Sequence, residues 1–407
     1  MNQQKSNPNR AITEYTAELW KYKKVPSEEI MPEPVQEYLR ESHTIDQFQV
    51  IAARVRGKLH KHNGTNCDDW FETENVDGIF VCAVSDGAGS KKFSRIGARA
   101  ACRRARFYLK TQLGKLLTRN PKLREDLAQD MTSRVFSESA KQLASMVQDA
   151  ILTAREGVLK ACEDRRRKDA YMRVVGRELE PKDFACTLLV TVAVPLDKEM
   201  LVVACQVGDG ITAVLNTSAD FDKAVTLLGT PDSGHYSGET DFLTSVKFSE
   251  KANLANRTML SRKPIDIIFS MTDGVADDYY PNGLELHRLY FDLVINHVLP
   301  LPKEIGECEQ KIDVPEPHSH LELSGEENRE RVAIQYTSEL CETNKMTLEE
   351  LWNNRAPLCE MAKKIATPKN RSADVRLQNW LNNYTVRGSF DDRTLVILRR
   401  GGEEIVE

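Results

Sequence analysis

The stretch Gly78-Ile79-Phe80-Val81-Cys82-Ala83-Val84-Ser85-Asp86-Gly87 is a continuous apolar run that ends in an aspartate and a glycine. Two later runs end in the same pair: residues 201–208 precede Asp209-Gly210, and residues 265–272 precede Asp273-Gly274. Short apolar runs bounded by turn residues are typical of buried strands. If such strands lie side by side, their carboxylates converge and repel one another unless a cation joins them. The pattern therefore predicts a site for a hard divalent cation.

A fourth acidic pair, Asp391-Asp392, comes just before the strand-like stretch 394–398. A single Asp-Gly pair after a strand usually marks only a turn, but three such pairs and a fourth acidic tip are harder to attribute to turns. Oxygen ligands select Mg²⁺, Mn²⁺ or Ca²⁺ over zinc and copper. Two Mg²⁺ or Mn²⁺ ions about 3.5–4 Å apart, bridged by a water, activate that water to attack a phosphoryl group. The acidic tips therefore indicate hydrolysis of a phosphate ester.

The composition excludes several other classes of protein. The chain has 407 residues and a formal net charge of -5, which gives no electrostatic reason to expect a nucleic acid or a membrane as partner. The nine cysteines are an odd number without a Cys-x-x-Cys pair, which argues against a disulfide framework and a zinc site. The N-terminus lacks an apolar signal segment, and no stretch reaches the roughly 18 apolar residues that span a membrane. We therefore expect a cytoplasmic protein.

Helical and strand-like segments occur in separate blocks along the chain. Residues 188–194 and 201–207 are typical of a hairpin, and helical periodicity fills 94–117 and 121–163. This arrangement favours an antiparallel α+β layered fold over a doubly wound parallel sheet. The expected divisions are an N-terminal appendage at 1–45, a core at 46–280, a helical insertion with an acidic loop at 281–384, and a final core strand with a C-terminal tail at 385–407.

The motifs taken together resemble one known family. They are similar to the metal-dependent Ser/Thr protein phosphatases of the protein phosphatase 2C class, in particular its bacterial branch. The segments that carry the resemblance, in family order, are Gly57-x-x-His60 with Gly64 and Cys67-Asp68-Asp69, then Val84 to Ser90, Ala185 to Leu189, Val207 to Gly210, Thr272 to Asp277, and Asp391-Asp392-Arg393-Thr394. The resemblance implies a four-layer αββα sandwich of two antiparallel sheets flanked by helices, with metals at one edge between the sheets. A helical insertion precedes the last strand.

The resemblance also implies which residues hold the metals. The ligands of a pair of Mg²⁺ or Mn²⁺ ions would be Asp69, Asp86, Asp273 and Asp391, with the carbonyl of Gly87 as an extra ligand and Asp209 serving a third, weaker ion. The first acidic motif leaves an alternative open. Its spacing favours Asp69, with Asp68 in the place of a glutamine, whereas an Asn-x-Asp form of the motif would make Asp68 the ligand. Asp392 stands where the family has an asparagine.

The chain departs from the family pattern at the substrate phosphate and at the insertion. The phosphate-binding arginine of the family has no clear counterpart, and the candidates are Arg54, Arg56, Lys58, His60 and His62. His60 has two further interpretations: a general acid near the leaving group, or a loop histidine hydrogen-bonded to the backbone. The insertion at 281–384 either gates the cleft, docks a protein partner or only elaborates the surface.

The leading hypothesis is a metal-dependent phosphoprotein phosphatase. It would hydrolyse phosphoserine and phosphothreonine by direct attack of a metal-bridging water, without a phosphoenzyme. One alternative is a non-catalytic, phosphatase-like binding module. The intact acidic set argues against it, because recognition alone has no physical need for converging carboxylates. The other alternative is a hydrolase of small phosphorylated metabolites on the same scaffold.

Overall fold

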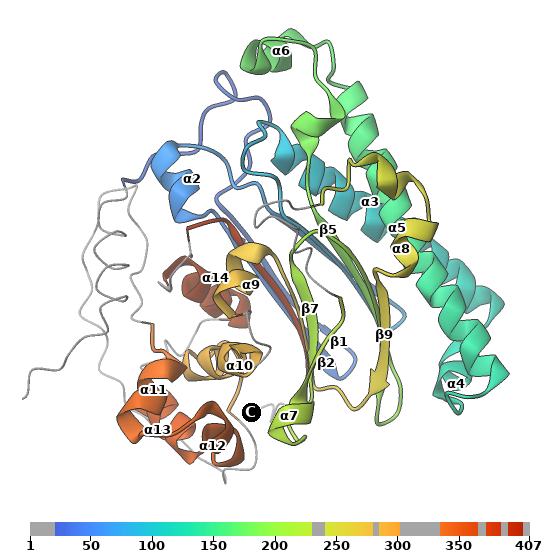
Figure 1. Cartoon of the computed structure of the whole chain (residues 1–407), viewed down its shortest axis with the longest axis vertical. Helices are drawn as coiled ribbons and strands as arrows, with labels where there is room; N and C mark the ends of the chain where they lie inside the picture. The colour runs from blue at the N-terminus through green and yellow to red at the C-terminus, as the bar shows by residue number, and fades with distance from the viewer. Residues whose placement is uncertain are drawn as a thin grey trace, which may run out of the picture.

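Two antiparallel β-sheets packed face to face form the centre of the molecule, and helices cover both outer faces (Figure 1). The structure is a computed structural model that describes residues 21–229, 241–279, 285–301, 334–364, 372–383 and 390–401. The αββα sandwich predicted from the sequence is confirmed, including helices that come between the last two strands.

Sheet A holds six strands in the order β1-β2-β11-β10-β7-β8, and sheet B holds five in the order β3-β4-β5-β6-β9. The strands of sheet A are β1 Tyr38–Ile45, β2 Phe48–Val55, β11 Arg393–Arg400, β10 Ile267–Met271, β7 Ile211–Leu215 and β8 Val225–Leu227. The strands of sheet B are β3 Trp70–Val76, β4 Ile79–Ser85, β5 Leu188–Pro195, β6 Met200–Val207 and β9 Thr258–Lys263.

Helices α3 and α5 pack on the outer face of sheet B, whereas α9, α10 and α14 pack on sheet A (Figure 1). The helices are α2 Lys58–Asn63, α3 Ser94–Arg119, α4 Leu123–Ala128, α5 Arg134–Glu163, α6 Asp169–Val175, α7 Phe221–Ala224, α8 Ala252–Ala255, α9 Asp273–Tyr279, α10 Glu285–Ile295, α11 Thr337–Asn344, α12 Leu348–Asn353, α13 Ala356–Lys364 and α14 Ala373–Asn383. Within the part of the chain described, no helix is long and apolar enough to cross a membrane.

The central strands are buried on both faces, which explains their continuous apolar sequences. In β2, Val50 and Ala52 pack between the two sheets. The alternate residues Ile51 and Ala53 pack on the opposite face, against the helices that cover sheet A. Because successive side chains of a strand point to opposite faces, a strand covered on both sides needs apolar residues at every position.

Strand β1 lies in the stretch that the sequence predicted as an N-terminal appendage. The structure pairs it with β2 along its whole length, so sheet A begins at Tyr38 rather than after residue 45. Its sequence, Tyr38–Ile45, alternates exposed and half-buried residues, because β1 is the edge strand of the sheet. An edge strand with polar residues lacks the apolar run that identified the central strands.

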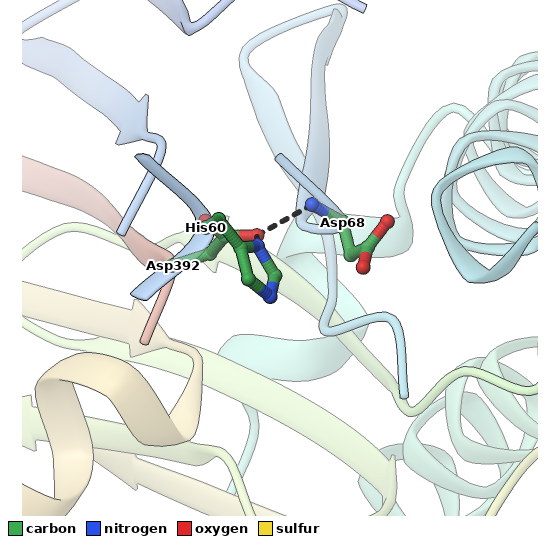
Figure 2. A group of neighbouring side chains, drawn as sticks. All are labelled: His60, Asp68 and Asp392. Atoms are coloured by element: carbon green, nitrogen blue, oxygen red, sulfur yellow. Dashed lines mark hydrogen bonds and ion pairs between the residues drawn. The ribbon is translucent and has the colours of Figure 1, made fainter. Parts of the chain in front are cut away.

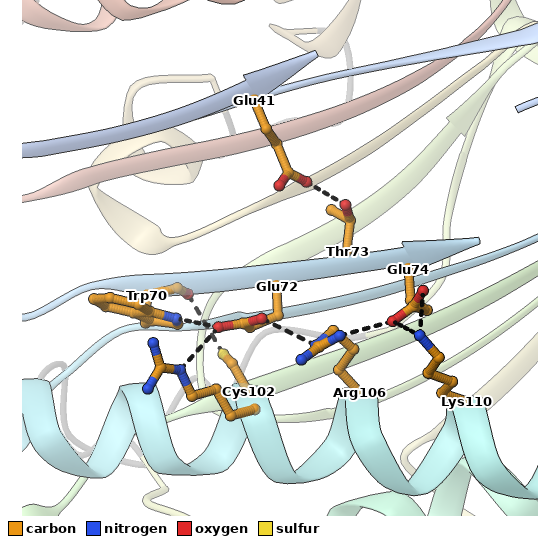
Figure 3. Close-up of polar contacts among 9 residues, drawn as sticks. Glu41, Trp70, Glu72, Thr73, Glu74, Cys102, Arg106 and Lys110 are labelled. Atoms are coloured by element: carbon orange, nitrogen blue, oxygen red, sulfur yellow. Dashed lines mark hydrogen bonds and ion pairs between the residues drawn. The ribbon is translucent and has the colours of Figure 1, made fainter. Parts of the chain in front are cut away.

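The sequence pattern did not predict strand β3 either, because β3 is an edge strand of sheet B and carries charged residues instead of an apolar run. Its outward side chains Glu72 and Glu74 form ion pairs with α3: Arg106 bridges both glutamates, at 3.0 Å and 2.7 Å, and Lys110 lies 3.1 Å from Glu74 (Figure 3). On the other face of β3, the Thr73 hydroxyl donates to a glutamate of β1. These contacts cover a charged edge strand with a charged helix face.

One buried carboxylate joins three of the helices that lie between β10 and β11. Asp292 of α10 accepts hydrogen bonds from the backbone N–H and the hydroxyl of Thr337, at 2.7 Å and 2.5 Å, and from the hydroxyl of Tyr279, at 2.8 Å. These contacts join α9, α10 and α11. The acidic loop expected at 300–330 lies almost entirely outside the described residues.

Glu33 joins the segment before β1 to three other parts of the chain. Its carboxylate accepts from Arg99 at 2.5 Å, and also from Arg165 and the hydroxyl of Tyr171. Burial by itself raises its pKa, but hydrogen bonds from Arg165 and Tyr171 and the charges of Arg165 and Arg99 outweigh burial and lower the pKa of Glu33 to about 2.

We expect Glu33→Gln to lower the free energy of unfolding at pH 7 by about 1–2 kcal/mol, a value reduced because the carboxylate is partly exposed. A lowered folded-state pKa stabilises the protein above the unfolded value, so the difference should shrink as pH falls from 4.5 towards 2. Urea unfolding at several pH values measures it, with the exposed Glu28→Gln as control. A difference that stays constant down to pH 3 would contradict this role.

Candidate metal centre

Four aspartates lie at strand ends along one edge of the sandwich. Asp69 precedes β3 and Asp86 follows β4, and the antiparallel pairing of these strands brings the two residues together. Asp273 follows β10 and Asp391 comes just before β11, and these strands are paired in the same way. One pair therefore comes from each sheet, as expected for a site between the sheets.

The charges of these carboxylates act strongly on one another. Burial raises the pKa of Asp86 well above its ordinary value, and the charges of the other three aspartates raise it further. Burial also raises the pKa of Asp273 well above its ordinary value, followed by the charges of Asp391 and Asp209. Such a cluster disfavours full ionisation, and a divalent cation is the group that removes the repulsion.

Two threonines orient the carboxylate of Asp69. The hydroxyls of Thr272 and Thr394 donate to its Oδ2 atom at 2.9 Å and 2.6 Å. The other oxygen, Oδ1, is buried and accepts no hydrogen bond from a described residue, and the same holds for Oδ1 of Asp273. Buried carboxylate oxygens without donors suit a cation, so these residues fit Mg²⁺ or Mn²⁺. The sequence motifs contained both threonines but gave them no role.

Asp209 and Asp277 lie at the outer side of the cluster. Both raise the pKa of Asp273. Asp209 also raises the pKa of Asp277, after burial. Neither is among the main charges that act on Asp86. Asp209 thus lies nearest to Asp273 within the cluster, and its service to a third ion stays a prediction.

The structure separates the two candidates of the first acidic motif. Burial raises the pKa of Asp68 to about 8, and the groups that act on it next are His60, Asp392 and Arg95. By contrast, Asp69 contributes directly to the raised pKa of Asp86. Asp69 therefore belongs to the carboxylate cluster, while Asp68 faces a different set of charges.

All three Asp-Gly pairs have a steric reason for the glycine. A Cβ atom at Gly210 would lie 2.6 Å from the carbonyl oxygen of Met271. A Cβ atom at Gly87 would lie 2.6 Å from the carbonyl oxygen of Asp68, and one at Gly274 would lie 1.8 Å from the carbonyl oxygen of Asp392. Contacts this short exclude any side chain, so glycine lets these backbone segments approach each other at the site.

Asp392 forms a buried network with His60 and the segment around it (Figure 2). One oxygen accepts from the backbone N–H of Gly57 at 2.6 Å, and the other accepts from that of Asp68 at 2.5 Å. His60 Nδ1 lies 2.8 Å from the second oxygen. Ligand atoms of His60, Asp68 and Asp392 all lie within 4.8 Å of one another. Both Asp392 oxygens already accept hydrogen bonds, so we interpret the group as a hydrogen-bonded network rather than a cation site.

His60 and Asp392 each stabilise the charged form of the other. Burial lowers the pKa of His60, but the charge and hydrogen bond of Asp392 outweigh it and raise that pKa to about 10. Burial raises the pKa of Asp392, and the charge and hydrogen bond of His60 reverse the shift and lower it. His60 thus lies on α2 against a carboxylate, and not in a loop against a backbone carbonyl. The sequence gave no role to Asp392.

Neither arginine proposed for phosphate binding has a free approach to the site. The side chain of Arg56 is fully buried, forms an ion pair with Glu37 at 3.0 Å and donates to the carbonyl of His60 at 2.8 Å. Arg54 is 1% exposed and lies over the Trp70 ring, 4.6 Å from its centroid. Both side chains are therefore engaged within the protein, and phosphate binding by Arg54 or Arg56 stays a prediction.

The two other candidates also have defined surroundings. His62, on the same helix as His60, accepts a hydrogen bond at Nδ1 from the backbone N–H of Lys21 at 3.0 Å. The Nζ atom of Lys58 is buried and has no hydrogen-bond partner among the described residues. Burial and the neighbouring charge of Arg393 lower the pKa of Lys58 to about 7. Its main charged neighbours do not include the metal-site aspartates.

Comparison with known proteins identifies similar sequences and structures. The sequence model of the protein phosphatase 2C family matches residues 56–306. The search of curated proteins gave no match. Similar solved structures include the serine/threonine phosphatase Stp1 from Staphylococcus aureus, with 10% identity over 94% of this chain and 99% of that chain and a TM-score of 0.36. The catalytic domain of the serine threonine protein phosphatase PstP, in complex with two manganese ions, has 11% identity over 87% of this chain and 99% of that chain and a TM-score of 0.35. These similarities are too low to transfer the role of any residue.

Proposed function

The chain belongs to the protein phosphatase 2C family, and we propose that it is a divalent-metal-dependent phosphatase acting on phosphoserine and phosphothreonine in proteins. The observation that supports the activity is the cluster of four aspartates, one pair from each sheet, in which Asp69 is buried and the other three are partly buried. Bringing four repelling carboxylates together lowers the stability of the metal-free protein at neutral pH, and a bound cation offsets that cost.

We assign the pair of Mg²⁺ or Mn²⁺ ions to Asp69, Asp86, Asp273 and Asp391, together with the carbonyl of Gly87. Asp209 would serve a third, weaker ion. When bound, the ions supply electrostatic stabilisation of the phosphoryl oxygens and lower the pKa of the attacking water. The protein holds Asp69 in one orientation through Thr272 and Thr394, which keeps its second oxygen available.

His60 is the residue we propose as the general acid for the leaving oxygen. It is 6% exposed, and its Nδ1 atom is held by Asp392, so Nε2 is the ring nitrogen left for substrate. A phosphoserine or phosphothreonine releases a strongly basic alkoxide, and a positioned acid lowers the barrier for such a leaving group by about 10²–10⁴-fold in rate.

We expect the purified chain to hydrolyse p-nitrophenyl phosphate at least about 10²-fold faster with Mn²⁺ or Mg²⁺ than with EDTA. The exposed Asp130→Asn should behave like the unmodified protein. The same rate with EDTA as with metal would contradict the proposed enzyme and favour a binding module. Phosphoserine and phosphothreonine peptides compared with small phosphorylated metabolites then identify the substrate class. A preference for the metabolites would favour the alternative hydrolase.

A further inference from the structure

We propose that Asp392 is a positioning residue whose carboxylate holds His60 so that imidazole Nε2 delivers a proton to the leaving oxygen of the phosphate ester. This inference rests on the proposed function and adds to it a residue that the sequence motifs left without a role.

The Asp392 carboxylate is placed to fix the whole segment that carries His60. It is 1% exposed and accepts hydrogen bonds from the backbone N–H groups of Gly57 and Asp68, at 2.6 Å and 2.5 Å. These two donors lie at either end of the segment that contains α2. The His60 imidazole lies between them, 2.8 Å from the same carboxylate. One side chain therefore holds both ends of the segment and the ring that the segment presents.

The second ring nitrogen, Nε2, lies beside the loop that follows Asp86. A Cβ atom at Gly89 would lie 3.7 Å from Nε2 of His60, and Gly89 is an exposed residue of the loop that follows Asp86. Nε2 therefore lies next to Gly89, which has no side chain and is three residues after the proposed metal ligand Asp86. A leaving group attached to a phosphate at the metal pair would lie on this side.

A carboxylate suits this position better than an amide does. Two backbone N–H groups, from Gly57 and Asp68, donate to residue 392, and His60 Nδ1 lies 2.8 Å from it. A carboxylate offers two acceptor oxygens, whereas an asparagine offers one oxygen and an NH₂ group that would face a donor. A carboxylate on Nδ1 also fixes the orientation of the ring and stabilises its charged form, as in other acid–histidine pairs.

The proton-transfer step balances without a further reagent. The bond between phosphorus and the serine or threonine oxygen breaks, and its electron pair goes to that oxygen, which takes the proton from Nε2. The oxygen of a water forms the new bond to phosphorus and gives up one proton to solvent. The neutral imidazole keeps its Nδ1 proton on Asp392 and regains a proton at Nε2 from solvent. The products are the alcohol and inorganic phosphate.

The test compares two leaving groups in the full chain loaded with Mn²⁺. A phosphoserine peptide needs a proton on its leaving oxygen, whereas p-nitrophenyl phosphate releases a weakly basic phenolate. We expect Asp392→Asn and His60→Gln each to lower kcat/KM for the peptide by about 10²–10³-fold. The loss for p-nitrophenyl phosphate should be at least tenfold smaller. The double variant should lose no more than the worse single variant, because the two residues act as one unit.

A binding measurement and a control variant distinguish the possible outcomes. The Mn²⁺-induced rise in melting temperature should persist in all three variants, and His43→Gln on the edge strand β1 is the matched histidine control. Equal losses for both substrates, or additive losses in the double variant, would show that Asp392 only supports the structure and would overturn the proposal. If Asp392→Asn does not fold, His60→Gln alone decides. An equal loss of kcat/KM for both substrates would then show that His60 does not donate the proton, and the proposal would be overturned. Unmodified protein without metal-dependent turnover would instead contradict the proposed function.

Discussion

Replacing Asp86 or Asp273 with asparagine is expected to lower metal-dependent turnover by at least about 10³-fold while raising the stability of the metal-free protein. Both effects follow from the same geometry. Each carboxylate is buried among like charges that raise its pKa. Removing one charge therefore relieves repulsion in the absence of metal, and we expect a gain of about 1–2 kcal/mol in the free energy of unfolding at pH 7.5.

The opposite signs of these two effects distinguish a metal centre from an ordinary buried polar cluster. Urea unfolding in EDTA measures stability, and thermal unfolding with and without Mn²⁺ measures binding. The asparagine variants should lose most of the Mn²⁺-induced rise in melting temperature. Asp209→Asn is the matched comparison. Its turnover should fall by only about 10-fold, and the Mn²⁺-induced rise in melting temperature should persist, because Asp209 is not among the main charges that act on Asp86. A metal-free Asp86→Asn protein that is less stable than the unmodified chain would contradict this account.

The sequence predicted the central strands and the carboxylates at their ends because both depend on local pattern. A strand covered on both faces is apolar at every position, as in Ile79–Ser85, and the aspartate that follows it is adjacent in sequence. The edge strands β1 and β3 broke that pattern. Glu72 and Glu74 face the charged side of α3, and that pairing involves side chains about 30 residues away along the chain.

The contacts that support the site could not be predicted from local sequence pattern either, because they join residues that are far apart in the chain. The two backbone groups that bind Asp392 are 335 and 324 residues away from it in sequence. Nothing near Asp392 indicates that its side chain faces α2. Arg56 is a second example, because its charge near the first acidic motif suggested substrate binding, while the contacts of its side chain could not be read from local pattern. Its guanidinium is in fact used by Glu37 and the carbonyl of His60.

The metal-free protein is expected to lose stability as pH rises from about 4 to 8, by about 3 kcal/mol or more. Burial is the main cause of the raised pKa of Asp69, about 7, and of Asp68, about 8, both from an ordinary value of 3.8. A group whose folded-state pKa is raised binds more protons when folded. Its contribution is complete below pH 3.8 and is lost as pH rises through the folded-state values.

Mn²⁺ or Mg²⁺ should reverse this dependence, because a cation binds the ionised carboxylates and its stabilisation grows as protons leave. Urea unfolding at pH 5.5, 6.5 and 7.5, in EDTA and in Mn²⁺, separates the two trends. Asp69→Asn should flatten the metal-free curve, because it removes one raised carboxylate, and should weaken the metal response. The exposed Asp130→Asn should change neither. A metal-free stability that is constant or rises over this range would show that the raised carboxylates, Asp69 among them, are already compensated within the protein. The cluster would then need no cation, and the physical reason for placing a metal pair between the two sheets would be lost.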